Sequence, residues 1–115
     1  MPTTVYKICG QVPWREAERA GAFHGTADDL RDGFIHLSSA MQVRETAARH
    51  FAAVAGLLLV AVDADALGDA LKWEVSRGGE LFPHLYGPLP LATVLWVKPL
   101  PLGEDRQHVF PELAR

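Results

Sequence analysis

The run Leu57-Leu58-Leu59-Val60-Ala61-Val62 constrains the fold more than any other segment of this chain. Its six successive apolar residues match the usual length of a strand and are far too few to span a bilayer. Apolar side chains on both faces are typical of a strand that is covered on both sides. We therefore expect a central strand here, in the middle of a sheet.

Further strand and helix patterns surround this run. Strands are predicted over residues 5–9, 33–37, 71–75, 80–84 and 92–97. A first helix is predicted over residues 14–20, with Pro13 near its start and Gly21 as its C-cap. Residues 25–32 are rich in turn formers and charge, so an exposed connection is expected there.

The second predicted helix covers residues 40–55. Ser39 and Gln42 match the capping-box pattern, and Val43, Ala47, Phe51 and Val54 line one face before Gly56. The element order predicts a single α+β domain over residues 1–115, with a split or mostly antiparallel sheet and two main helices.

Composition excludes several classes of function. The chain has 115 residues and a net charge of -3, and its basic residues form no block that could follow a duplex nucleic acid. Cys9 is the single cysteine, so no intrachain disulfide can form and a reducing compartment suits the chain. The N-terminus lacks the pattern of a secretory signal. We expect a cytoplasmic monomer that does not contact membranes.

His36 is the first candidate for a functional residue. Strand alternation places it on the same face as Phe34 and Ser38, where an imidazole can bind a phosphate or sugar hydroxyl, or move a proton near neutral pH. Ser38 can assist on that face. The alternative is a histidine that is satisfied inside the fold by a backbone carbonyl.

Residues 72–80 form the second candidate segment. Glu74 can accept from a ribose hydroxyl or act as a base, and Arg77 precedes two glycines, where a phosphate can approach the backbone closely. The alternative is a hairpin with a surface ion pair, because exposed pairs are common and contribute little.

His84 and Tyr86 form the third candidate, two residues apart and potentially on one face. They can frame an aromatic or sugar ligand, although Tyr86 can equally pack with its hydroxyl at the rim. No metal site is predicted, because the five histidines and Cys9 lack metal-ligand spacing. Cys9 is expected to be a buried apolar residue, and His50 and His108 surface residues.

Several segments together resemble the bacterial family known as domain of unknown function 952. They are VYKI, DGFIHLSSAMQVRETAARHF, LLLVAVDADAL and LKWEVSRGGELFPHLYGPLPL. The family looks like a distant relative of the ADP-ribosyltransferase fold, which includes the tRNA 2′-phosphotransferases and binds NAD in a cleft between two small sheets. The resemblance places Lys7 where those enzymes carry a histidine or arginine. It matches His36 and Ser38 to the second-strand motif, and makes Glu74 the nearest acidic candidate.

Two kinds of function follow from these residues. The first is a transferase that handles NAD or a related nucleotide as substrate, in which Lys7 and Arg77 hold phosphates, His36 and Ser38 orient the ribose, and Glu74 stabilises the cationic sugar. The second is a noncatalytic module that binds a small anionic or nucleotide-like ligand, or a partner peptide, in the same pocket. An interaction protein with an exposed tryptophan patch is less favoured, because Trp14, Trp73 and Trp96 each suit core packing.

Overall fold

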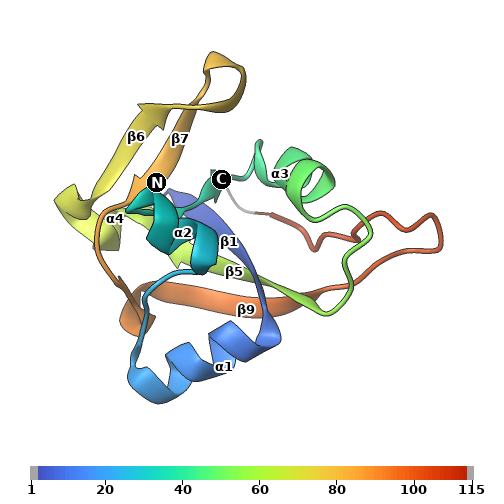
Figure 1. Ribbon diagram of the computed structural model, residues 1–115, viewed down its shortest axis with the longest axis horizontal. Coiled ribbons are helices and arrows are strands. Elements are labelled where there is room, and N and C mark those ends of the chain that lie inside the picture. The colour runs from blue at the N-terminus through green and yellow to red at the C-terminus, as the bar shows by residue number, and fades with distance from the viewer. Residues whose placement is uncertain (1–2, 114–115) are drawn as a thin grey trace.

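The computed structural model describes residues 3–113, which form three antiparallel sheets with helices packed around them (Figure 1). The largest sheet has the order β4-β1-β5-β9, with bounds Ser38–Ser39, Thr4–Gly10, Leu57–Asp63 and Val94–Leu100. The second has the order β3-β7-β6, with bounds Ile35–His36, Leu81–Leu85 and Leu71–Val75. The third pairs β2, Ala22–Phe23, with β8, Leu89–Pro90. The expected α+β class with a mostly antiparallel, divided sheet is confirmed.

Helices cover both faces of the largest sheet. The α-helices of the described residues are α1 Gln11–Ala20, α2 Ala27–Asp32, α3 Val43–His50 and α4 Ala64–Leu67. Short 3₁₀ helices cover Gly68–Ala70, Arg77–Gly79 and Leu91–Thr93. The two longest helices, α1 and α3, lie on opposite sides of β1, β5 and β9 (Figure 1).

Strand β5 is the centre of the core, as its apolar sequence predicts. It pairs with β1 on one side and β9 on the other. Leu58, Val60 and Val62 pack in one buried cluster with residues of α1, whereas the alternate residues pack in a second cluster with residues of α3. The two clusters account for the absence of polar residues between positions 57 and 62.

Helix α3 is shorter than the sequence predicts. Gln42 Oε1 accepts a hydrogen bond from the Ser39 amide, but this contact closes a turn before the helix, which begins at Val43. The helix ends at His50, and Ala53 has a φ of 57°, which an α-helix cannot contain. Val54, expected on the buried face, is therefore 43% exposed.

The connection expected over residues 25–32 is largely exposed, but it is not irregular and it buries Asp29. This segment contains α2, and a capping box opens it, since the side chains of Thr26 and Asp29 each accept from the other's backbone amide. Gly33 ends the helix in the left-handed conformation, with a φ of 85°. The six-residue helix is stabilised through its caps and through the contacts of Asp29 with Lys7 and His36.

Only Ile35–His36 of the strand predicted over residues 33–37 forms a strand, and a second short strand, Ser38–Ser39, follows in another sheet. His36 pairs with His84 in β7, whereas Ser38 pairs with Tyr6 in β1. Leu37, between them, donates its amide to the Pro83 carbonyl. The chain thus crosses from one sheet to the other at Leu37, and the candidate site forms at this crossing.

The β6–β7 hairpin extends from the body of the molecule, at the upper left of Figure 1. Trp73 lies on it and is 42% exposed, so the expectation that all three tryptophans suit the core is wrong for Trp73. Strand β9 continues through Pro99, which an edge strand tolerates because only one side is paired. No helix within residues 3–113 is long and apolar enough to cross a membrane.

Candidate functional site

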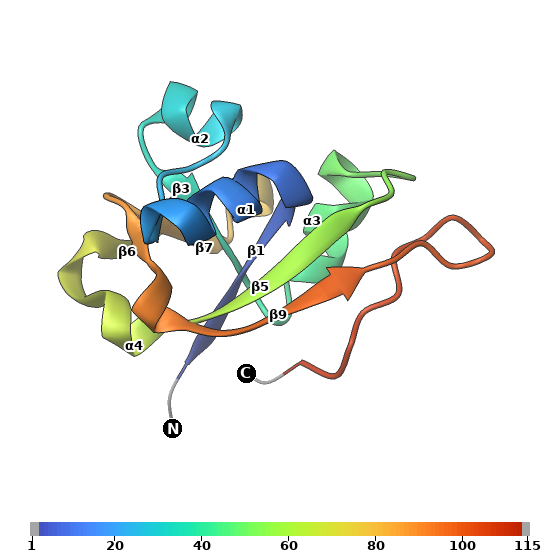
Figure 2. The same ribbon diagram turned by 90° about the horizontal axis from the view of Figure 1, so that it is seen from below.

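A pocket of about 470 Å³ lies where β3 passes into β4. Strand β1, helices α2 and α3, the turn after β6 and strand β7 all contribute to its wall. These elements are well separated along the chain, and Figure 2 shows α2 and α3 apart from each other. The side chains that carry its polar chemistry are Lys7, Asp29, His36, Ser38, Arg77 and His84.

Asp29 organises one side of the pocket. Its side chain is 1% exposed, and Oδ1 accepts from the His36 amide at 3.0 Å and faces His36 Nδ1 at 2.6 Å. Oδ2 accepts from the Thr26 amide at 2.9 Å and lies 2.8 Å from Lys7 Nζ. Burial acts to raise the pKa of Asp29, but the hydrogen bonds from His36 and the charge of Lys7 outweigh it, so the pKa is lowered.

His36 lies between two carboxylates. Its Nδ1 contacts Asp29, and its Nε2 lies 2.9 Å from Asp32 Oδ2. A hydrogen bond from Arg31 is the main cause that lowers the pKa of Asp32, and the charge of His36 adds to it. Both ring nitrogens therefore face ionised acceptors, and the ring is fixed in place although 39% of the side chain is exposed.

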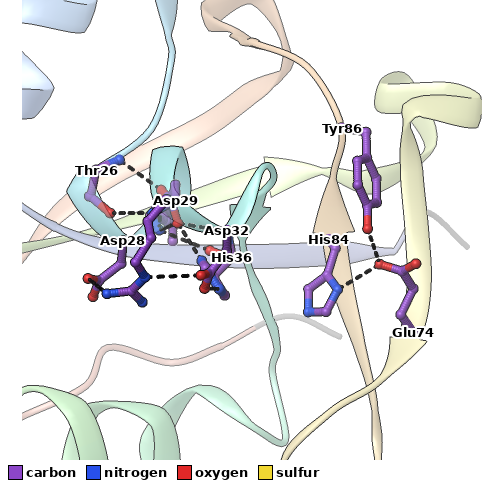
Figure 3. Close-up of polar contacts among 10 residues, drawn as sticks. Thr26, Asp28, Asp29, Asp32, His36, Glu74, His84 and Tyr86 are labelled. Carbon is purple, nitrogen blue, oxygen red and sulfur yellow. Dashed lines mark hydrogen bonds and ion pairs between the residues drawn. The ribbon is translucent and has the colours of Figure 1, made fainter.

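His84 has a carboxylate on one nitrogen only. Figure 3 shows Glu74 Oε1 between His84 Nδ1, at 2.8 Å, and the Tyr86 hydroxyl, at 2.7 Å. The hydrogen bond from Tyr86 is the largest cause that lowers the pKa of Glu74, and the bond from His84 is the next largest. The bond between Tyr86 and Glu74 also raises the pKa of Tyr86. The second nitrogen, Nε2, lies on the side of the ring that faces His36 in Figure 3, and it has no hydrogen-bond partner within residues 3–113.

Phe34 holds the aromatic side chains of the site together. Its ring stacks on that of His84 with a centroid distance of 4.0 Å and an interplanar angle of 26°. The centroid of the Phe34 ring also lies 4.6 Å from that of the His36 ring and 5.4 Å from that of the Tyr86 ring. This packing restricts the orientation of both imidazoles.

Arg77 supplies a cation from the turn after β6. Its guanidinium lies 4.8 Å from the centre of the Phe82 ring, and 21% of the side chain is exposed. Its polar contacts are long, at 3.4 Å to Thr46 Oγ1 and 3.7 Å to Glu45 Oε2. A guanidinium has five N–H donors, so most of them remain available to an anion in the pocket.

The family model of proteins of unknown function named DUF952 matches residues 8–97 of this chain. The chain belongs to the DUF952 family. The crystal structure of CC0527 from Caulobacter crescentus has a TM-score of 0.89 and 48% identity, over 93% of this chain and 94% of that one. The solution NMR structure of CC0527 has a TM-score of 0.81 and 49% identity, over 90% of each chain. No curated protein matches the chain.

In this DUF952 chain, five of the seven site residues predicted from the sequence line one pocket. These are Lys7, His36, Ser38, Arg77 and His84. Glu74 does not line it but lies behind His84, and Tyr86 contacts Glu74 from the hairpin.

Two of the five are engaged by neighbouring groups. Lys7 is 6% exposed, and its Nζ contacts Asp29 and also donates to the His36 carbonyl at 3.1 Å. Ser38 is 4% exposed, and its hydroxyl lies 3.0 Å from that of Thr46. Both side chains thus support the wall of the pocket.

Sequence reasoning missed three residues of the site: Asp29, Asp32 and Phe34. The signal for Asp29 is present, because Thr26 and Asp29 have capping-box spacing, although aspartate stands where glutamate or glutamine is usual. Cys9 is buried as expected, and burial, as the largest cause, raises its pKa to about 11. His50 is exposed, as expected for a surface residue, and it also lines the pocket.

Proposed function

We propose that this protein binds a small anionic, nucleotide-like ligand in the pocket at the β3–β4 crossing and acts on it as an NAD- or nucleotide-handling transferase related to the ADP-ribosyltransferases. The observation that carries this proposal is that a half-buried guanidinium and two carboxylate-backed imidazoles, from three different segments, line one pocket. Imidazoles and guanidinium groups placed together in this way are typical of sites that bind and process phosphates.

Each side chain then has a distinct role. Arg77 binds a phosphate of the ligand with donors that its protein partners leave available. Asp32, at the partly exposed side of the pocket, accepts from sugar hydroxyls, and His36 holds the Asp32 carboxylate in place. Lys7 and Ser38 support the wall instead of contacting phosphate and ribose directly, because each already has a protein partner.

The division of the sheet supports the assignment to this class. The ADP-ribosyltransferase resemblance predicts a nucleotide cleft between two small sheets, and the pocket has β1 of one sheet and β7 of another in its wall. Its volume of about 470 Å³ lies within the range of small-molecule sites.

Ligand binding is tested by isothermal titration with NAD, ADP-ribose, AMP and inorganic phosphate. We expect binding of at least one nucleotide, with affinity lowered about tenfold or more in Arg77→Gln, since the loss of a charge-assisted contact costs about 1.5–3 kcal/mol. Arg15→Gln is the matched control, because Arg15 is exposed on α1 and pairs with Glu18 away from the pocket. Failure of all four compounds to bind would refute the proposal.

Turnover is tested by incubation with NAD and quantification of released nicotinamide. Wild-type protein is expected to release more than a variant that combines His36→Ala and Glu74→Ala. Equal release would leave no support for chemistry at this site.

A noncatalytic binding module is the second candidate. It is favoured by His36, whose two nitrogens both face carboxylates and so leave no free nitrogen for proton transfer. A module of this kind binds the nucleotide and returns it chemically unchanged after prolonged incubation, which mass spectrometry detects.

A further inference from the structure

We propose that His84 is a proton-accepting catalytic residue of the pocket, and that Glu74 is a positioning residue that fixes its ring and its proton. This inference rests on the proposed function and assigns the chemistry of the same site. Glu74 then contacts Nδ1 of the His84 imidazole and not the ligand.

His84 is buried, and one of its two ring nitrogens has no partner within the described residues. The side chain is 8% exposed, yet it lines the pocket, and Nε2 has no hydrogen-bond partner within residues 3–113. Because the residue is otherwise buried and lines the pocket, Nε2 is the ring atom that water or a ligand in the pocket can bond. Stacking on Phe34 at 4.0 Å keeps the ring from turning this nitrogen away.

The contact with Glu74 determines the tautomer of His84. The Glu74 carboxylate is an acceptor, and the hydrogen bonds from Tyr86 and His84 lower its pKa, so it is ionised at neutral pH. A contact of 2.8 Å from Nδ1 to this oxygen requires a proton on Nδ1. In the neutral ring the lone pair then belongs to Nε2, where it can accept a proton from a bound substrate.

His36 differs from His84 because both of its ring nitrogens face carboxylates. Nitrogens of that ring lie 2.6 Å from Asp29 and 2.9 Å from Asp32, so neither offers a lone pair to a ligand. The ring centroids of His36 and His84 are 5.9 Å apart. The His36 imidazole therefore keeps its protons in bonds to the two carboxylates, whereas the His84 imidazole can exchange a proton at Nε2. A single small substrate can reach both rings.

The step that this arrangement performs is deprotonation of a hydroxyl acceptor, either water or an alcohol. As the hydroxyl oxygen forms a bond to C1 of the ribose, its proton moves to Nε2 of His84. The bond from C1 to the leaving group breaks, and nicotinamide departs as a neutral molecule with the electron pair. The imidazolium, paired with the Glu74 carboxylate, then releases its proton to solvent.

The tautomer is tested without any ligand, by ¹⁵N-edited NMR of the histidine rings near pH 8. We expect His84 in the Nδ1–H form in wild-type protein and in Tyr86→Phe, and a mixture of tautomers in Glu74→Gln, where the charged acceptor is lost. Diethyl pyrocarbonate should modify Nε2 of His84, and NAD or ADP-ribose should protect it, whereas modification of exposed His24 should not change. An Nε2–H tautomer, or modification that neither nucleotide reduces, would overturn the inference.

Catalysis is tested with His84→Asn, whose amide nitrogen replaces Nδ1 as a donor to Glu74 but leaves no group at Nε2. We expect nicotinamide release to fall by about 10²–10⁴-fold, the usual contribution of a positioned acid or base, with affinity for ADP-ribose changed less than about threefold. A loss of affinity without a change in kcat would make His84 a binding residue and overturn its catalytic role. Wild-type protein that releases no nicotinamide would overturn that role as well. Loss of binding in Arg77→Gln tests the proposed function separately, so the two failures are distinguishable.

Discussion

Asp29 is the residue on which the site depends most. It joins three segments, because its carboxylate contacts Thr26 at the start of α2, Lys7 in β1 and His36 in β3. A buried charge is stable only when it is paired and hydrogen-bonded, and all of these contacts are present. Asp29, in α2, thereby fixes the position of the His36 imidazole, which lies in a different element, β3.

The first prediction concerns the stability conferred by Asp29. Asp29→Asn leaves the Lys7 ammonium buried without a counter-charge, so we expect the free energy of unfolding to fall by about 3–5 kcal/mol in urea denaturation at pH 7. Lys7→Met combined with Asp29→Asn should recover part of this loss, because no unpaired charge remains.

The pH dependence of stability follows from the same residue. The pKa of Asp29 is lowered in the folded chain, so its contribution is fully present above the unfolded value of about 3.9 and is lost as the pH falls toward the folded pKa. Wild-type protein should therefore lose stability between about pH 5 and pH 2 more steeply than the variant that combines Lys7→Met and Asp29→Asn. Parallel curves would contradict this assignment.

At the scale of elements, α2 carries the contacts between Asp29 and the rest of the site. It has six residues and depends on its caps, because isolated helices of this length are unstable in water. Thr26 caps its N-terminus, and Gly33 ends it. A change at the cap should therefore reach the site through Asp29.

We expect Thr26→Ala to destabilise the protein by about 1 kcal/mol, the usual cost of losing a side-chain N-cap. Thr26→Ser keeps the hydroxyl and is the control, with stability close to that of the wild type. Thermal unfolding measures both, and equal stability of the alanine and serine variants would show that the cap contributes little.

Short elements were the least predictable from the sequence. Strands β3 and β4 have two residues each, and they are strands only because β7 and β1 pair with them. Residues 27–32 contain four charged side chains, which is typical of a solvated surface, and the burial of Asp29 depends on Lys7, 22 positions earlier. By contrast, residues 57–62 could be predicted correctly because their apolar character alone requires a covered strand.

At the scale of the whole molecule, stability is concentrated around β5. Leu59 is completely buried there, so Leu59→Ala should lower the free energy of unfolding by about 2–5 kcal/mol. Leu95→Ala is the matched control in the edge strand β9, where Leu95 is 53% exposed, and its effect should stay within about 0.5 kcal/mol. Chemical denaturation distinguishes the two, and similar losses would contradict the central position of β5.

The candidate site could be predicted only in part, for a reason that belongs to the whole fold. Alternation along single strands correctly places polar residues on shared faces, but it cannot say which strand brings His36 and His84 opposite each other. It also cannot reveal that Glu74 contacts the back of His84. Those relations arise from pairing between segments that are distant in sequence.

The buried contact between Lys7 and Asp29 has a further consequence for how the chain reaches its native pairing. If β1 paired with β5 one residue out of register, every side chain of β1 would turn to the opposite face. The Lys7 ammonium would then enter the apolar layer beneath α3, with no carboxylate beside it, at a large energetic cost. The ion pair between Lys7 and Asp29, which helps to position the His36 imidazole, thus also makes misregistered pairing of β1 unfavourable. Correct pairing of β1 and correct assembly of the site therefore depend on the same contact.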